Sequence, residues 1–116
     1  MLRHVRIALV LTMCFVTCTI AAPPKVVITS PDNGEIDVDP AVTEIRVEYD
    51  QPMSPDGKSI LGGGPTFPQI SGKITWANPK TLVIPVTLKP DQQYQMNFNS
   101  DTYRNFQNAR GDSAEW

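Results

Sequence analysis

Apolar and polar residues alternate along residues 44–50 of this chain. Ile45, Val47 and Tyr49 fall on one face of an extended backbone. The opposite face carries the charged residues Glu44, Arg46, Glu48 and Asp50. A period of two is typical of a strand with one buried and one solvent-facing side. The pattern therefore predicts a strand over residues 44–49, in a sheet that covers a core on one side only.

Further short strands are predicted between the turn signals of the chain. They cover residues 25–29, 59–61, 70–76, 81–88 and 94–99, with a short extended piece at 36–38. Eleven prolines and seven glycines are spread along the sequence, so the elements are short and separated by turns. That organisation is typical of an all-β sandwich. We expect an Ig-like Greek-key β-sandwich of about six to seven short strands.

Two positions inside these strands carry specific expectations. Pro85 lies within residues 81–88, and since proline has no N–H to donate, this strand is expected to be an edge strand or to carry a bulge. Residues 77–80 are expected to join it to the strand at 70–76 as a hairpin. Tyr94 follows a Pro-Asp corner and begins the strand at 94–99. This placement matches the tyrosine corner of Ig-like sandwiches, in which the hydroxyl bonds to nearby backbone.

The first 21 residues predict a secretory signal peptide. Arg3 and Arg6 precede an apolar run at residues 7–16, and small residues follow at Thr19 and Ala21. This order of basic, apolar and small residues is typical of a cleaved export signal. An uncleaved anchor is the alternative, although a spanning helix needs about 20 apolar residues and this run is shorter. The interpretation divides the chain into a signal peptide at 1–21 and one domain at 22–116, exported to the periplasm, the medium or the cell surface.

Removal of residues 1–21 changes the chemistry available to the protein. Both cysteines, Cys14 and Cys18, and the only histidine, His4, lie in that segment. Because residues 22–116 contain no His and no Cys, Ser-His-Asp catalysis, Cys-His catalysis and the usual tetrahedral zinc sites are excluded for this part of the chain. We expect no enzymatic activity, no catalytic residue, no cofactor and no metal.

The charge balance narrows the class of partner. Ten Lys and Arg less Arg3 and Arg6 leave eight basic residues against twelve Asp and Glu, a net charge of -4 for residues 22–116. An acidic surface argues against nucleic acid as a partner, and against a membrane beyond the signal segment. A protein partner and a carbohydrate both remain compatible with this charge.

A skeleton of short motifs runs through residues 24–112. Its members are Ser30, Pro31 and Gly34, then Val38 and Pro40, then residues 49–53, and finally Pro90 and Tyr94. This skeleton resembles the bacterial Ig-like domain of the SbsA type, a family first associated with surface-layer proteins. Gly62–Pro65 resembles a variant in exported bacterial proteins that also carry hydrolase or peptidase domains. The resemblance implies a domain without catalytic residues of its own that serves as a spacer, stalk or docking module.

The end of the sequence departs from that family. The family closes its sandwich with a final alternating strand, whereas this sequence reads Ser113-Ala114-Glu115-Trp116 at its end. We expect the final strand to be missing from the domain at 22–116. Two explanations stay open: a truncated reading frame, or a protein partner that fills the open sheet edge by adding a strand.

Three groups of residues suggest more specific chemistry, each beside a structural alternative. An acidic group could supply oxygen ligands for calcium, although turns favour the same residue types: Asp32, Glu35, Asp37 and Asp39. Arg110-Gly111-Asp112 matches a cell-adhesion tripeptide, or is a solvated turn with Gly111 at positive φ. Trp76, Tyr103 and Phe106 could form an aromatic platform for sugars, or pack in the core.

The leading functional hypothesis is a non-catalytic exported Ig-like module that acts as a spacer or protein-interaction unit, and as an accessory to an enzyme in longer relatives. The alternative is a carbohydrate-binding or adhesion module at the cell surface. The two differ in one feature. A sugar binder exposes its aromatic side chains beside polar neighbours, whereas a spacer keeps Trp76, Tyr103 and Phe106 buried.

Overall fold

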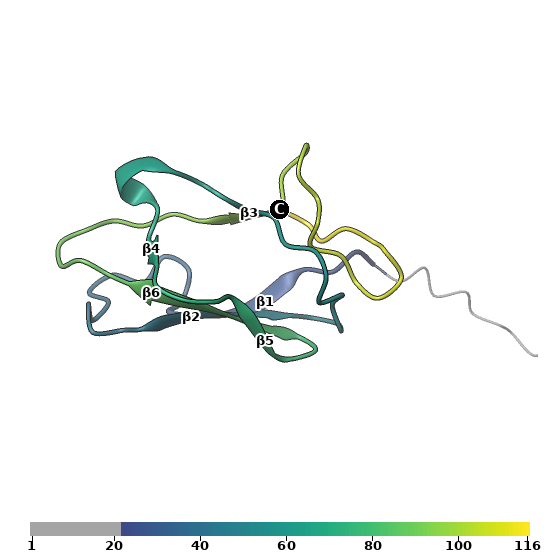
Figure 1. Cartoon of the computed structure of the whole chain (residues 1–116), viewed down its shortest axis with the longest axis horizontal. Coiled ribbons are helices and arrows are strands. Elements are labelled where there is room, and N and C mark those ends of the chain that lie inside the picture. The colour runs from purple at the N-terminus through teal and green to yellow at the C-terminus, as the bar shows by residue number, and fades with distance from the viewer. Residues whose placement is uncertain (1–21) are drawn as a thin grey trace, which may run out of the picture.

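The computed structural model describes residues 22–116, so the predicted signal peptide lies outside the described residues. These residues form seven strands and one single-turn 3₁₀ helix (Figure 1). The strands are β1 (Val26–Ser30), β2 (Glu44–Tyr49), β3 (Ile60–Leu61), β4 (Gln69–Ile70), β5 (Thr75–Asn78), β6 (Thr81–Thr87) and β7 (Asn97–Phe98), and the helix is η1 (Gly64–Thr66). Within residues 22–116, no helix has the length and apolar character needed to span a bilayer.

The larger sheet is antiparallel and has the strand order β1-β2-β6-β4, with β5 also paired to β6. In the β2–β6 pair, Ile45 lies opposite Ile84 and Val47 opposite Leu82. This register places the apolar sides of both strands on one face, where Val47, Leu82 and Ile84 are fully buried. The alternation over residues 44–50 is therefore confirmed as the pattern of a half-buried strand.

The smaller sheet contains β3 and β7, with Ile60 opposite Phe98. It faces the larger sheet across the core, as Figure 1 shows. The strands are divided between the two sheets as in an Ig sandwich. If the two-residue β4 is left aside, one sheet has the order β1-β2-β6-β5, which corresponds to the first, second, fifth and fourth strands of an Ig sandwich. The other sheet contains β3 and β7, which correspond to the third and sixth. The expected all-β Ig-like architecture is confirmed.

Pro85 is accommodated differently from the expectation. The sequence predicts an edge strand or a bulge at Pro85. β6 is an interior strand of its sheet, so the edge-strand alternative is wrong, and the β2–β6 register runs as far as Pro85 without a shift. The predicted strand at 70–76 is instead two strands, β4 and β5, and the interruption between them lies opposite Pro85. Ser71 N–H donates to the Pro85 carbonyl at 3.0 Å, on the side where proline lacks its own N–H. The backbone N–H that Pro85 lacks would therefore lie opposite the break between β4 and β5.

Two other predicted elements are shorter than expected. Residues 36–38 form no strand, because Asp37 takes a φ of +61°, a left-handed conformation that a strand does not permit. Within residues 94–99 only Asn97–Phe98 is regular strand. The tyrosine corner is nevertheless formed: the Tyr94 hydroxyl accepts a hydrogen bond from Lys89 N–H at 2.7 Å. The corner holds the turn that leads from β6 into β7.

Candidate interaction groove

The three aromatic residues considered for sugar binding do not form a common surface. Trp76 packs against Tyr49 and Phe106, with ring centroids 6.1 and 6.4 Å apart. Phe106 is fully buried, whereas Tyr103 is 57% exposed. Core packing of Trp76 and Phe106 is confirmed, and the expected burial of Tyr103 is wrong. The platform is absent because Phe106 is buried in the core and Trp76 packs against it, partly buried, while Tyr103 is exposed elsewhere.

The core also contains two polar atoms without partners. Neither Tyr49 Oη nor Trp76 Nε1 has a hydrogen-bond partner within residues 22–116. Burial disfavours the charged phenolate and raises the pKa of Tyr49. Tyr49 is therefore neutral over the physiological range, and its role is to pack against Trp76 and Phe106.

Two of the four acidic residues of the β1–β2 connection, Glu35 and Asp39, bind backbone within their own turns. Glu35 Oε2 accepts from Asp32 N–H at 2.9 Å, and Asp39 Oδ1 accepts from Ala41 N–H at 2.8 Å. No group of three or more potential metal ligands is found in the described part of the chain. These contacts favour the structural interpretation of the acidic residues over a calcium site.

The loop that carries Arg110-Gly111-Asp112 is organised by Asn108, which is 3% exposed. The Asn108 Oδ1 accepts from the N–H groups of Arg110 and Asp112 at 3.0 and 2.9 Å. Its Nδ2 donates to Asp112 Oδ2 at 3.1 Å, so this carboxylate is engaged within the loop. Gly111 has a φ of +89°, as expected for a turn. The contacts favour a structured turn over an adhesion tripeptide with a free carboxylate.

Asn99, at the end of β7, connects the smaller sheet to the last residues of the sequence. Its Nδ2 donates to the carbonyls of Phe106 and Ala114 at 2.9 and 3.1 Å, and its Oδ1 accepts from Phe106 N–H at 2.9 Å. Asn99 is 1% exposed and has a φ of +68°. Sequence reasoning missed this role. The signal was an asparagine directly after an apolar strand, because asparagine tolerates left-handed backbone better than most residues.

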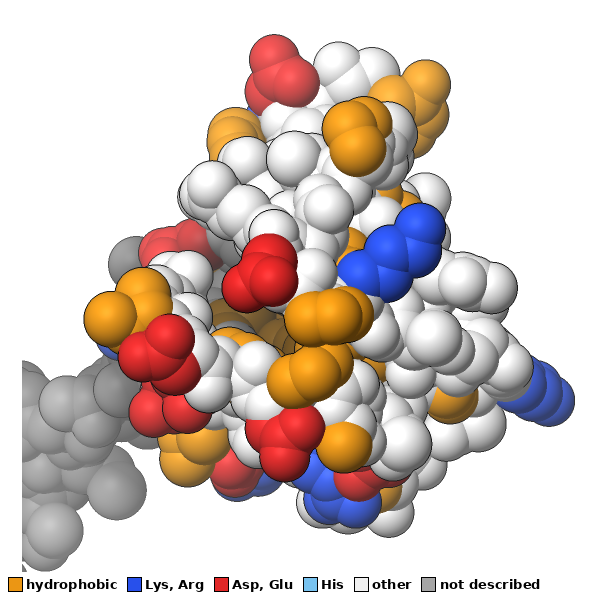
Figure 2. All heavy atoms as spheres, turned by 90° about the vertical axis from the view of Figure 1, so that its left-hand side faces the viewer, with side chains coloured by type: hydrophobic (Ala, Val, Ile, Leu, Met, Phe, Trp, Pro, Cys, Tyr) orange, Lys and Arg blue, Asp and Glu red, His pale blue; other side chains and the backbone are white. Residues whose placement is uncertain are grey.

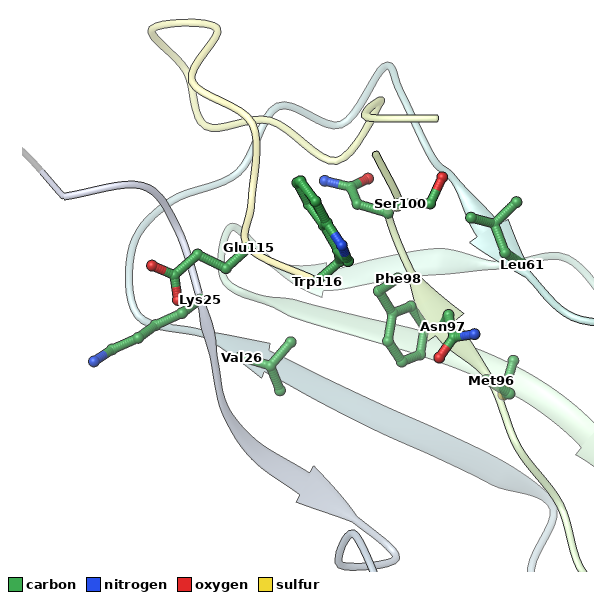
Figure 3. A pocket seen from close by; sticks show the side chains of 10 residues that line it. Lys25, Val26, Leu61, Met96, Asn97, Phe98, Ser100, Glu115 and Trp116 are labelled. Atoms are coloured by element: carbon green, nitrogen blue, oxygen red, sulfur yellow. The ribbon is translucent and has the colours of Figure 1, made fainter. Parts of the chain in front are cut away.

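Between β1 and β7 lies an open groove with a volume of about 530 Å³. Figure 3 shows Val26 from β1 and Phe98 from β7 at this groove, with Glu115 and Trp116 nearby. Leu61 and Met96 line it further along, and all four of these apolar side chains are half-buried. Lys25 and Glu115 supply its charged groups. The groove is thus an apolar channel between the two sheets.

The backbone of β7 is unpaired on the side of this groove. Asn99 N–H donates to the Ser59 carbonyl at 2.9 Å, which places residues 97 and 99 in hydrogen-bonded positions against β3. Because backbone groups alternate along a strand, Met96 and Phe98 direct their N–H and C=O groups away from β3. Among residues 22–116, no strand pairs with β7 on that side. The groove therefore contains a free strand edge as well as apolar side chains.

One end of the molecule is visibly acidic. Figure 2 shows the end formed by the β1–β2 connection, η1 and the β6–β7 connection. A hollow opens near its centre, with hydrophobic side chains at its mouth and several acidic side chains around it. This distribution agrees with the excess of acidic over basic residues in the sequence.

Two facing antiparallel sheets, a tyrosine corner and an aromatic core define an Ig-like β-sandwich module. The sequence itself matches the family model described as bacterial Ig-like domain over residues 21–115. The chain belongs to the bacterial Ig-like domain family. Neither a search of curated proteins nor a search of solved structures found a match.

Proposed function

We propose that this chain is an exported, non-catalytic Ig-like module that acts as a spacer or protein-interaction unit. The observation that carries the proposal is the packing of Trp76 against Tyr49 and Phe106. Sugar sites use exposed aromatic faces, whereas here Phe106 is fully buried and Trp76 is partly buried against it. What the surface offers instead is the backbone edge of β7, which is a means of binding protein.

The absence of catalysis is supported by the residue types of the domain. Residues 22–116 contain neither His nor Cys, so the common nucleophile and base pairs are lacking. The acidic side chains of Glu35 and Asp39 bond to turn backbone. Membership of the bacterial Ig-like family supports the same conclusion.

Export and subfamily belong to the same proposal. Export is supported by the basic, apolar and small residues of positions 1–21. The SbsA type is supported by the motif skeleton around Ser30, Pro31 and Tyr94. A module of this kind would be displayed outside the cytoplasm, either between other domains or against another protein.

Tryptophan fluorescence tests the proposal against carbohydrate binding. The sequence has two tryptophans, Trp76 and Trp116, and Trp116 is 66% exposed. A Trp116→Phe variant isolates the emission of Trp76, and Trp76→Phe isolates that of Trp116. We expect weak acrylamide quenching in the first variant, strong quenching in the second, and no change in Trp76 emission on titration with soluble peptidoglycan fragments or oligosaccharides. Strong quenching of Trp76, or a saturable response to any of these sugars, would overturn the proposal.

A further inference from the structure

We infer that Asn33, in the connection between β1 and β2, is a modification site that deamidates without an enzyme. The backbone nitrogen of Gly34 attacks the Asn33 side chain, and the residue becomes aspartate or isoaspartate. This inference goes beyond the proposed function and does not depend on it. It assigns to one of the six asparagines of the sequence a reactivity that the surroundings of the other five suppress.

The reaction needs only these two neighbouring residues and one water molecule. The Gly34 nitrogen forms a bond to Asn33 Cγ, and the side-chain nitrogen leaves as ammonia with the proton of the Gly34 N–H. The product is a cyclic succinimide, which forms readily because the step is intramolecular. Water then opens the ring and restores the Gly34 N–H. Opening at Cγ gives aspartate, and opening at the main-chain carbonyl gives isoaspartate, whose backbone runs through Cβ and Cγ.

Glycine at the next position leaves the attacking nitrogen open. Apart from the neighbouring residues in the chain, no atom lies within 4 Å of the place that a Cβ on Gly34 would take. Both Asn33 and Gly34 are exposed. The Gly34 φ of +81° is a conformation that glycine adopts without strain. Water and the Asn33 side chain can therefore both reach this peptide bond.

No hydrogen bond protects the reacting groups. Within residues 22–116, neither the Gly34 N–H nor the Asn33 side-chain amide has a hydrogen-bond partner. The turn around them is closed by Glu35 N–H, which donates to the Asp32 carbonyl at 3.0 Å, and by Asp32 N–H, which donates to Glu35 Oε2 at 2.9 Å. Both bonds lie at the exposed surface, so the turn opens locally at a small cost in free energy. Opening lets the Asn33 side chain rotate onto the Gly34 nitrogen.

Two other asparagines are held in place by hydrogen bonds. Asn99 and Asn108 are only 1% and 3% exposed. The Asn99 amide bonds to the backbone of Phe106 and Ala114 through both its nitrogen and its oxygen. The Asn108 amide is likewise engaged through both atoms. Attack on either side chain requires these buried bonds to break, which raises the barrier.

The remaining three asparagines are blocked by the residue that follows each of them. Asn78 precedes Pro79, whose nitrogen carries no hydrogen and cannot attack. Asn97 and Asn105 each precede a phenylalanine, and the bulk of that side chain hinders approach to its amide nitrogen. Exposure, a following glycine and a free N–H thus coincide at Asn33 alone among the six.

Deamidation adds charge to an end of the molecule that is already acidic. The new carboxylate is ionised at neutral pH, because the ordinary pKa of aspartate is about 3.9. The net charge of residues 22–116 therefore changes from -4 to -5. The β1–β2 connection lies at the acidic end shown in Figure 2. None of residues 32–37 is buried, so we expect the modified chain to stay folded.

Peptide mapping tests the inference. The purified chain is incubated at neutral and at mildly alkaline pH, digested with trypsin and compared by mass spectrometry with an unincubated sample. Cleavage after Lys25 and Arg46 gives the peptide 26–46, in which Asn33 is the only asparagine and glutamine is absent. We expect acid to accumulate in this peptide and not at the other asparagines. Conversion should be faster at alkaline pH, because the attacking nitrogen must lose its proton.

Two results of this experiment would overturn the inference. One is a peptide 26–46 that stays unchanged in the folded chain, whether or not the chain reacts after denaturation in urea. The other is conversion at Asn99 or Asn108 in the folded chain that is as fast as at Asn33. Burial and hydrogen bonds would then not decide which amide reacts.

A substitution tests the chemistry of the attack. In Asn33→Gln the same nitrogen must close a larger ring, so conversion at this position is expected to slow about tenfold or more, which is about 1.4 kcal/mol in activation free energy. The matched control is Asn78→Gln, which should leave the rate at Asn33 unchanged. Conversion of Asn33→Gln at the rate of the parent chain would contradict attack by the Gly34 nitrogen.

The charge of the product gives an independent readout. Aged chain should develop a more acidic fraction on anion exchange that elutes with fresh Asn33→Asp and has the melting temperature of the parent chain. The same fraction appearing equally fast in aged Asn33→Gln would place the new charge at another residue and would overturn the inference.

Discussion

The larger sheet and the segment after β7 are held together in different ways. In the larger sheet, β2 and β6 pair through a continuous backbone ladder, and β1 pairs with β2 with one irregularity between Val26 and Ile28. The core side of this ladder carries Val47, Tyr49, Leu82 and Ile84, all of them buried. After β7 there is no further regular strand in residues 99–116, only isolated bridges such as Gln107 to Ser113. There the side-chain amides of Asn99 and Asn108 bond to the backbone and replace a ladder.

This difference predicts two kinds of response to mutation. A ladder strand at the centre of a sheet contributes to one cooperative unit, so damage to it lowers the stability of the whole domain. A segment held by a few side-chain hydrogen bonds can open by itself, with a smaller free energy than global unfolding. The following substitutions test whether residues 99–116 are such a segment.

Ile84→Ala, in the central strand β6, should have the largest effect. Ile84 is fully buried, and truncating it should lower the free energy of unfolding by about 2–5 kcal/mol through lost burial and a residual cavity. The matched control is Ile28→Ala on β1, where the side chain is 58% exposed and the expected change is within about 0.5 kcal/mol. Urea denaturation followed by circular dichroism measures both. Similar losses at the two positions would mean that the exposed side of β1 is also buried in solution.

Asn99→Ala should have an intermediate and more local effect. The substitution leaves the Phe106 N–H and the Phe106 and Ala114 carbonyls without their side-chain partner, at a cost of about 1–3 kcal/mol. Hydrogen exchange should accelerate at the amides of Phe106 and Ala114 while the amide of Tyr49, bonded to the Lys80 carbonyl, stays protected. The control is Asn97→Ala, because the Asn97 side chain is exposed.

Equal acceleration at Tyr49, Phe106 and Ala114 in Asn99→Ala would contradict the comparison. It would show that residues 99–116 unfold only together with the larger sheet. Retained protection at Phe106 would show instead that burial of its ring, and not the Asn99 amide, holds the segment.

The same contrast between the larger sheet and residues 99–116 explains how much of the fold could be predicted from the sequence. The strand at 44–49 and the buried positions of 81–88 were predictable, since a period of two reports a sheet face directly. The roles of Asn99 and Asn108 were not, because their partners lie up to 57 residues away in the sequence and no periodicity marks them. The groove was predictable only as an open sheet edge. Its position needed the sheet order that brings Val26 and Phe98 together.

Tyr94→Phe should have the smallest effect of the three substitutions. The Tyr94 hydroxyl accepts a hydrogen bond from Lys89 N–H, and its loss should lower the free energy of unfolding by about 1 kcal/mol, the usual net value of one such bond. In a domain of this size that corresponds to a fall of about 4–8 °C in melting temperature. Tyr103→Phe is the matched control, since Tyr103 is largely exposed and should tolerate the same change without loss.

The position of Tyr94 between the two regions makes this small effect informative. Its corner follows β6 and precedes β7, so the hydrogen bond belongs either to the cooperative sheet or to the locally held part. If the corner belongs to the sheet, Tyr94→Phe should lower protection at Tyr49 and at Phe106 by the same factor. If only Phe106 loses protection, the boundary between the regions lies before Tyr94. An unchanged melting temperature in Tyr94→Phe would show that water replaces the hydroxyl at Lys89, and the corner would then be a feature of geometry without a contribution to stability.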